Sequence, residues 1–313
     1  MKKTIRQRAA DIACLALAIL PLIGGMVLKV LTHPQSDGVE ITGAHIFFTI
    51  PMPLQDLPIT ESQVNSWLVI LSVLGLSLFL TRNLRIRDIS IRQHIAEWIV
   101  EKTDALVRGN MGEYFMAFSP FVCAVMALSA LSSLLTLIGL FPPTSDLNVV
   151  AGWAILVTIL ITHYKLKAGP VHYIKSFGDP VPFLAPLNII SEVATPVSMS
   201  FRHYGNVLSG TVISALLASA LSGLSALLLG WLPAGLSDIA FLQIGLPAVL
   251  SVYFDIFSGC MQAFIFAMLT MLYISGGFPY DEWAARKKRR EARRAASRQS
   301  TQLHELNGGK QNA

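Results

Sequence analysis

The chain has little charge and lacks the motifs that carry much of enzyme chemistry. Only 14% of its 313 residues are charged, whereas soluble domains have about 25%. The three cysteines have no CxxC or Cys/His spacing, so neither a disulfide framework nor a zinc site is supported. No GxxxxGK[ST], HExxH or GxSxG motif occurs. These absences argue against an ordinary soluble enzyme.

Long apolar runs take the place of charge, and 53% of the residues are hydrophobic. A membrane-spanning helix needs about 20 apolar residues. Six runs approach or exceed this length, at residues 13–31, 64–80, 114–141, 149–162, 181–232 and 239–274. We therefore predict an all-α polytopic membrane protein with about six membrane-spanning helices, of which the last two are long enough to form a steeply tilted hairpin.

Lysine and arginine gather in every second connection between these runs. They lie at residues 2–8, 82–108, 165–175 and from 286 onward, and are absent from the other connections. The positive-inside rule then places both termini in the cytoplasm. The net charge of +5 is explained by this placement, and no basic stretch interleaved with aromatics indicates nucleic acid. Of the 24 Lys and Arg residues, only Lys29 and Arg202 fall outside the predicted cytoplasmic segments.

The apolar runs and the charges divide the chain into eight segments. They are an N-terminal cytoplasmic start with an extra transmembrane helix (1–32), an outer loop (33–63), a transmembrane helix (64–81), a cytoplasmic amphipathic segment (82–112), a transmembrane hairpin (113–164), a cytoplasmic loop (165–182), the tilted hairpin (183–275) and a basic cytoplasmic tail (276–313). The first segment starts like a signal peptide, but it is long and lacks a small-residue cleavage site, so we predict a retained span.

Helical spacing identifies one further helix, at the predicted inner surface. Five apolar residues recur with charges between them: Ile91, Ile95, Trp98, Ile99 and Leu106. This pattern predicts an amphipathic helix lying on the membrane.

Polar residues follow one face of each of the last two helices. On the fifth helix these are Asn188, Thr195, Met199, Arg202, Asn206 and Ser209, with Glu192 toward one edge; on the sixth they are Ser251, Asp255, Ser258 and Gln262. Two such faces on neighbouring helices predict a shared crevice containing water. Taken singly, Ser209, Ser251 and Ser258 are better explained as helix-packing residues.

Arg202 is the residue whose position most needs an explanation. An arginine at the centre of a membrane helix costs roughly 2.5 to 3.5 kcal/mol on insertion scales. Its side chain stays protonated in proteins, so it cannot relay a proton, but it can act as a fixed positive gate. Glu192 lies about 15 Å of helix rise to one side, and Asp255 about 10 Å to the other if Gln262 is level with Arg202. This arrangement suits two half-length aqueous paths separated by a cation.

The chain resembles the subunit a family of F-type ATP synthases from about residue 59 to residue 274. The segments that carry the resemblance are PITESQVNSWLVI, YFMAFSPFV, PPTSDLNVV, PLNIISEVATPVSMSFRHYGNVLSGTVI and GLPAVLSVYFDIFSGCMQAFIFAMLTMLYIS. The most specific feature is an arginine followed by xxGN on one long helix, with QAFIF on the next. The resemblance implies a non-catalytic, ion-translocating subunit of the Fo sector, in the cell inner membrane, with no cofactor, metal or catalytic residue.

The resemblance also implies roles for individual residues. Arg202 matches the essential arginine that faces the carboxylates of the c-subunit rotor ring, and Asn206 and Gln262 match its polar neighbours. Glu192 matches an acidic position of the inner half-channel.

Two positions depart from the better-known bacterial pattern. Thr211 stands where many members carry an acid, and Asp255 stands where a histidine is common. We interpret Asp255 as a single substitute for that pair in the outer half-channel. Asn188, Ser209, Ser258 and Thr211 are weaker candidates for the path.

The partners implied by the resemblance are the c-ring, the b subunits of the peripheral stalk and, indirectly, the F1 head, with H⁺ or Na⁺ as the transported ion. The chief alternative is a stand-alone ion-coupled secondary transporter, which would also bury an arginine and carboxylates near the midplane. Such carriers usually have paired halves, whereas here the polar residues are concentrated in one C-terminal hairpin. An embedded enzyme using His203 is a third class, but no carboxylate lies at a local spacing that would orient this histidine.

Overall fold

The computed structural model describes residues 5–32, 43–53, 56–87, 89–178, 181–229, 249, 252–276, 278, 280, 283–285 and 287–293. The chain forms two compact units. The first is Met1–Thr158 with Ile190–Leu272, and the second is Ile159–Ile189 with Tyr273–Ala313.

Among the described residues, six helical segments are long and apolar enough to cross a membrane. They are Gln7–Thr32, Glu61–Thr81, Glu113–Ile138, Leu147–Lys167, Pro182–Leu228 and Val252–Gly276. The expected all-α polytopic membrane fold is therefore confirmed.

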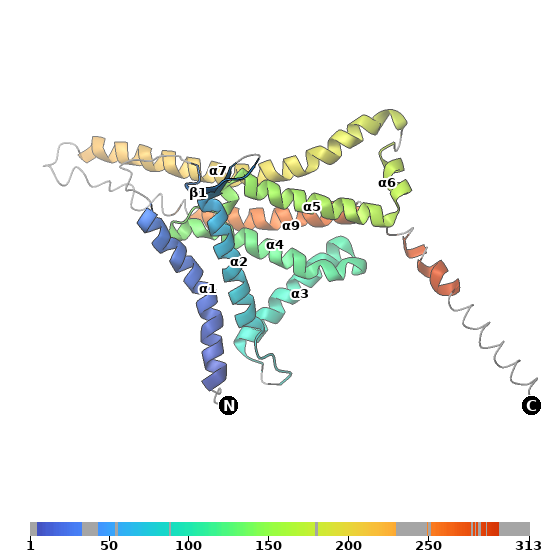
Figure 1. Ribbon diagram of the computed structural model, residues 1–313, viewed down its shortest axis with the longest axis horizontal. Coiled ribbons are helices and arrows are strands. Elements are labelled where there is room, and N and C mark those ends of the chain that lie inside the picture. The colour runs from blue at the N-terminus through green and yellow to red at the C-terminus, as the bar shows by residue number, and fades with distance from the viewer. Residues whose placement is uncertain are drawn as a thin grey trace, which may run out of the picture. The chain divides into compact units, whose positions relative to one another are not determined.

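The first two helices, α1 (Ile5–Thr32) and α2 (Glu61–Thr81), run side by side (Figure 1). Gly75 makes this approach possible, because a Cβ atom there would lie 2.5 Å from the backbone nitrogen of Ala18. Glycine at a crossing point allows two membrane helices to touch through their backbones. α1 is thus packed as an integral part of its unit.

A β-hairpin lies between α1 and α2, where the sequence predicted only a loop. β1 (Ile46–Ile50) pairs antiparallel with β2 (Leu57–Thr60). The backbone N–H of Glu61, the first residue of α2, donates to the carbonyl of His45 at 2.7 Å. The hairpin is therefore tied directly to the start of α2.

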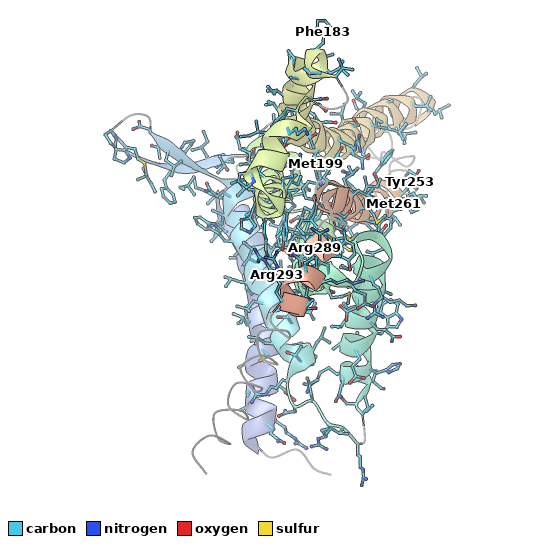
Figure 2. The ribbon with its side chains drawn as sticks, turned by 90° about the vertical axis from the view of Figure 1, so that its right-hand side faces the viewer. Phe183, Met199, Tyr253, Met261, Arg289 and Arg293 are labelled. Carbon is cyan, nitrogen blue, oxygen red and sulfur yellow. The ribbon has the colours of Figure 1, made fainter. Side chains whose placement is uncertain are left out.

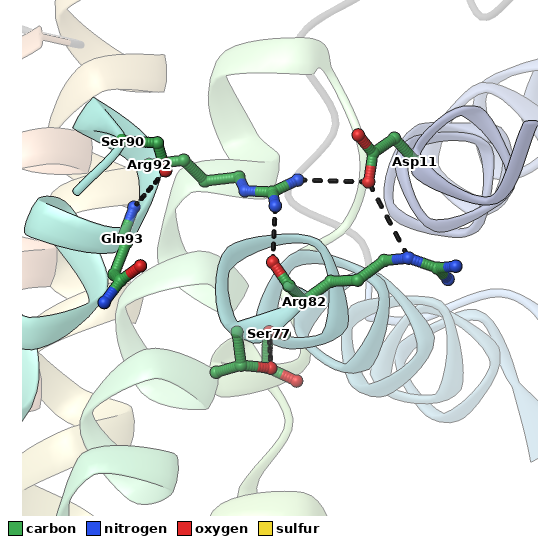
Figure 3. Close-up of polar contacts among 7 residues, drawn as sticks. Asp11, Ser77, Arg82, Ser90, Arg92 and Gln93 are labelled. Carbon is green, nitrogen blue, oxygen red and sulfur yellow. Dashed lines mark hydrogen bonds and ion pairs between the residues drawn. The ribbon is translucent and has the colours of Figure 1, made fainter. Parts of the chain in front are cut away.

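A polar junction ties α1 and α2 to α3 (Ile91–Met111) (Figure 3). The Arg92 guanidinium lies 3.1 Å from the carboxylate of Asp11 and also donates to the backbone carbonyl of Arg82. Its carbon is 5.0 Å from the centre of the Phe79 ring, which is a cation–π distance. Asp11 is buried, with 8% of its surface exposed. One guanidinium therefore joins three segments.

The α3 helix presents part of its apolar stripe outward. Ile91, Ile95 and Trp98 are exposed, whereas Ala96, Thr103 and Val107 are buried against the rest of the unit. Ile99 and Leu106 are half-buried. An exposed apolar stripe is typical of a helix that lies in the membrane interface.

The segment that follows α3 supplies the wall behind the candidate site. It comprises η1 (Glu113–Phe118), α4 (Ser119–Leu134), η2 (Leu135–Ile138), η3 (Pro143–Ser145) and α5 (Leu147–Ala168). An apolar cluster joins this wall to α1 and α2; its members are Val69, Leu135 and Leu140, with Leu22, Val73, Leu128 and Leu131 packed around them.

Two long helical segments carry the predicted polar faces. α7 (Ala185–Leu229) has 45 residues, which is about 68 Å of rise and far exceeds the roughly 30 Å of a bilayer core. It continues through Pro196 without a break. The last segment begins with the π-helix η6 (Val252–Ser258) and continues as α9 (Gly259–Gly276).

The second unit contains helical structure in the segment predicted as a cytoplasmic loop. α6 (Pro170–Ser176) begins with a proline, which is favoured at the first helical position, and η4 (Pro182–Leu184) precedes α7. In the basic tail, residues 287–293 are helical, and Lys287 pairs with Glu291 at 3.9 Å. Residues 294–313 of the predicted tail lie outside the described part of the chain.

Candidate functional site

The arginine-bearing face of α7 lies on the outside of the first unit. Arg202, Asn206 and Ser209 are exposed, whereas Met199, which shares this face by spacing, and His203 are buried. Within the described residues, no hydrogen bond or ion pair joins the Arg202 guanidinium to another group. The first unit therefore presents an unpaired guanidinium on its surface.

The two predicted polar faces meet at Asn206. Its side-chain N–H donates to the hydroxyl oxygen of Ser258 at 2.8 Å, which links α7 to η6. Gln262 follows one turn later and is buried, with 3% of its surface exposed. No hydrogen bond joins Gln262 to Arg202 or Asn206 in the part of the chain that the structure describes. The structure thus brings Asn206 and Ser258 together, and it leaves Gln262 behind them.

A small cavity of about 20 Å³ with a partly polar lining adjoins this contact, which is room for about one water molecule. Its lining comes from α4, α7, η6 and the start of α9: Ser133, Thr136, Asn206, Val207, Gly210, Phe254, Ser258 and Gly259. The two α4 hydroxyls donate to backbone carbonyls, Ser133 to Ser129 at 3.2 Å and Thr136 to Ser133 at 3.0 Å. Each hydroxyl oxygen therefore keeps a lone pair free to accept a further bond.

Sequence reasoning missed the contribution of α4. The available signal was the spacing of Ser129, Ser133 and Thr136, which follow at steps of four and three residues and so share one helical face. Hydroxyls at this spacing are common packing residues in membrane helices. Only the position of α4 beside Asn206 distinguishes them.

His203 is a packing residue in this structure. It is fully buried, and its ring lies edge-on to Trp153 and Phe266, with centroids 6.1 and 5.4 Å away. Its Nε2 is 3.4 Å from the hydroxyl of Ser129. No carboxylate in the described chain bonds to it. These contacts place His203 on a different face from Arg202, as the helical spacing predicted.

The structure describes three further candidates on α7. Glu192 is half-buried, and Asn188, which belongs to the second unit, donates to the carbonyl of Phe177 at 2.8 Å. Thr211 is exposed, and its hydroxyl donates to the carbonyl of Val207 at 3.1 Å. A hydroxyl used in this way satisfies its donor within its own helix and needs no partner on another helix.

Two candidates on the sixth helix lie wholly or partly outside the described chain. Ser251 is not described, and of Asp255 only the backbone is, within η6. The expected depth of Asp255 assumed α-helical geometry, but its backbone is part of a π-helix. Since a π-helix bonds residue i to i+5, it shifts the angular positions of the residues before it.

The exposed surface beside the arginine face is apolar. Tyr253, Phe257 and Met261 on η6 and α9 are each about half exposed, and so is Phe201, the neighbour of Arg202. Figure 2 shows Tyr253 and Met261 along this last helical segment, with Met199 on α7. Across the described residues, no group of three or more His, Cys, Asp or Glu side chains could hold a metal ion. The surface suits contact with lipid or with another apolar helix.

Close packing of α9 on α4 gives a test of this geometry. A Cβ atom on Gly259 would lie 2.6 Å from the Cβ atom of Ser133, so Gly259→Ala forces the helices apart. Overpacking of this kind costs about 1–3 kcal/mol, and we expect a lower melting temperature in mild detergent. Gly223→Ala is the matched control, because nothing lies within 4 Å of that position. Adding Ser133→Gly should recover part of the loss, and a Gly259→Ala variant as stable as the parent would contradict the packing.

Comparison with known proteins gives one consistent family. The model of the family described as ATP synthase A chain matches residues 63–275. The sodium ion specific ATP synthase subunit a of Propionigenium modestum is 26% identical over 298 residues, covering 83% of this chain and 94% of that protein. The ATP synthase subunits a of Desulforamulus reducens and Priestia megaterium are each 31% identical, covering 69% and 71% of this chain and 78% and 94% of those proteins.

Proposed function

Because the chain belongs to the ATP synthase A chain family, we propose that it is the stationary ion-conducting subunit of the Fo membrane sector, with Arg202 separating two half-channels. Membership of this family identifies the chain as a multi-pass membrane subunit with an ion-translocating role. The proposal adds the half-channels, the arginine gate and the absence of bond chemistry in this chain. It also places the subunit in the cell inner membrane, with both termini in the cytoplasm as the lysines and arginines predict.

The observation that carries the proposal is the exposure of Arg202 on a helix of membrane-spanning length. Charged side chains in membrane helices almost always face a protein interior or a water-filled cavity. Arg202 faces neither within the described part of its own unit, since it is exposed and unpaired there. We infer that its counter-charge comes from another molecule. The rotor carboxylates of a c-ring supply such a charge, one after another, while the apolar residues beside Arg202 suit contact with the ring's helices.

The proposed mechanism uses Arg202 as a fixed charge. An ion arrives from the outer side past Asp255 and neutralises a rotor carboxylate, which can then turn into lipid with little desolvation penalty. Asn206, Ser258 and the cavity beside them form the inner end of this outer path. When the carboxylate returns from the other side, the Arg202 charge favours its ionised form. The released ion leaves along a path that contains Glu192.

The energetics require many such crossings for each ATP made. One elementary charge crossing 100 mV delivers about 2.3 kcal/mol, so several charges must pass during each turn of the ring. A continuous pore would dissipate this energy. The stationary cation prevents that loss because an ion can cross only when the ring carries it.

The class of protein can be tested by what remains bound in mild detergent. We expect the chain to copurify with small, very apolar c chains, with b subunits and with a peripheral ATPase. Direct staining and mass spectrometry of the purified complex would identify these chains. A chain that purifies alone and transports a solute after reconstitution would overturn the proposal in favour of a carrier.

A further inference from the structure

The first helix, α1, lies outside the family match, which begins at residue 63. Its packing nevertheless resembles that of a core helix at three positions along its length: its middle and its two ends. At the middle level, the backbone of α1 at Leu17 and Ala18 lies so close to Gly75 that a Cβ atom there would clash with it at 2.5–2.7 Å. A helix held only by lipid would not need a glycine at this point.

At one end, α1 contacts both α2 and the segment after α4. Leu22 packs against the cluster of Val69, Leu135 and Leu140. A Cβ atom on Gly25 would lie 2.6 Å from Leu68 and 3.5 Å from Leu140. α1 is therefore seated in the groove between α2 and η2.

Lys29 adds a polar contact at the same end. Its ammonium donates to the carbonyl of Gly139, the residue that ends η2 with a positive φ of 74°. A carbonyl at a helix C-terminus has no partner within the helix and attracts a cation. Lys29 thus caps the end of the α4–η2 segment from a different helix.

At the other end, Asp11 holds α3 through Arg92 (Figure 3). Asp11 also lies 3.8 Å from the guanidinium of Arg82, at the end of α2. Without Asp11 the Arg92 charge would lose its acidic partner in a partly buried position. α1 therefore secures both ends of the structure formed by α2, α3 and α4.

The secured segment is the wall behind the candidate site. Ser129 contacts His203, the neighbour of Arg202, and Ser133 touches the position of Gly259 on α9. Ser133 and Thr136 also line the cavity beside Asn206. A movement of α4 would change all of these contacts together.

We propose that α1 is a brace that fixes the α4–η2 wall and α3, and thereby keeps α7 and η6 in register for ion transfer. In this proposal Lys29 and Asp11 are positioning residues. Lys29 acts through η2, and Asp11 acts through α3. The effect on ion transfer rests on the proposed function, whereas the seating of α1 does not.

The seating is tested by cysteine labelling of the intact complex. Leu140 is 2% exposed and lies under α1. The thiol of Leu140→Cys therefore becomes accessible only when α1 moves away. The native Cys14, Cys123 and Cys260 are first changed to serine. We expect a water-soluble maleimide to label the thiol of Leu140→Cys in open membrane fragments about tenfold faster when Gly75→Leu is also present. The leucine side chain would clash with the backbone of α1 and force this helix away. Gly24→Leu is the matched control, since nothing lies within 4 Å of Gly24.

The functional consequence is measured as proton-driven ATP synthesis by sealed inverted vesicles prepared from the same cells. We expect Gly75→Leu and Lys29→Met to lower the rate about threefold or more, in line with the coupling that packed networks transmit. Lys29→Arg keeps a cationic donor and should restore the rate, which a role in bulk stability alone would not require. Slow labelling of the Gly75→Leu variant would overturn the seating. Fast labelling with an unchanged rate of synthesis would overturn the role of the brace.

Discussion

Arg202→Ala is expected to abolish proton-driven ATP synthesis while the complex still assembles. Arg202 is exposed and makes no bond to the described part of the chain, so its loss should not disturb packing. Without the cation, a returning rotor carboxylate loses the charge that favours its ionised form, and the two half-channels are no longer separated. The measurement is ATP synthesis by inverted vesicles with an imposed proton gradient. Passive proton flow through the membrane sector should persist, because the aqueous paths remain.

Two further variants define what the first result means. Arg202→Lys should also fail, because lysine can lose its proton when desolvated and lacks the planar fork of five donors. Full activity of this variant would show that charge alone suffices. Arg108→Ala is the control, since Arg108 forms only an exposed pair with Glu113, and such pairs contribute little. Normal synthesis by Arg202→Ala would remove the gate from the mechanism.

Asp255→Asn is expected to impair ion uptake from the outer side more strongly than Glu192→Gln does. The amide keeps the shape of the carboxylate but cannot accept a proton, so entry past Asp255→Asn needs a higher outer proton concentration and exit past Glu192→Gln needs a lower inner one. The measurement is the rate of ATP synthesis with the pH of each side varied separately. Asp255→Asn should shift the curve of rate against outer pH toward acid, and Glu192→Gln should shift the curve of rate against inner pH toward alkali.

The control for this pair is Glu291→Gln, which makes the same change in the exposed ion pair with Lys287. This variant should leave the dependence of the synthesis rate on outer pH and on inner pH unchanged. Equal effects of Asp255→Asn and Glu192→Gln on the same side would contradict the assignment of the two carboxylates to opposite half-channels.

The helices of this fold follow from the sequence because apolar length is a strong signal. The position of the polar residues on α7 follows as well, since 3.6-residue periodicity places Arg202, Asn206 and Ser209 together. The hydrogen bond between Asn206 and Ser258 joins one residue from each of the two predicted polar faces. Roles that depend on contacts between distant segments do not follow from the sequence in this way. The part played by Ser133 depends on which helix lies beside it, and no local pattern contains that information.

The structural features that the sequence did not predict have specific physical causes. The β-hairpin was missed because its strands are only five and four residues long, with Pro51 and Pro53 between them and Pro58 inside β2. Asp11 was not singled out because its burial depends on Arg92, which is far away in the chain. Gln262 was expected near Arg202, but its burial is a consequence of how α9 packs.

The π-helix η6 has a consequence for how this segment can change during evolution. A wider turn accommodates a residue that an ordinary helix would not. Deleting one residue between Val252 and Ser258 could therefore return the backbone to regular α geometry without breaking it. Because the wider turn absorbs the extra residue, the residues before the deletion would keep nearly their present faces, while α9 stayed in place. A single-codon deletion could thus remove one side chain from this segment and leave the helix on either side of it in register.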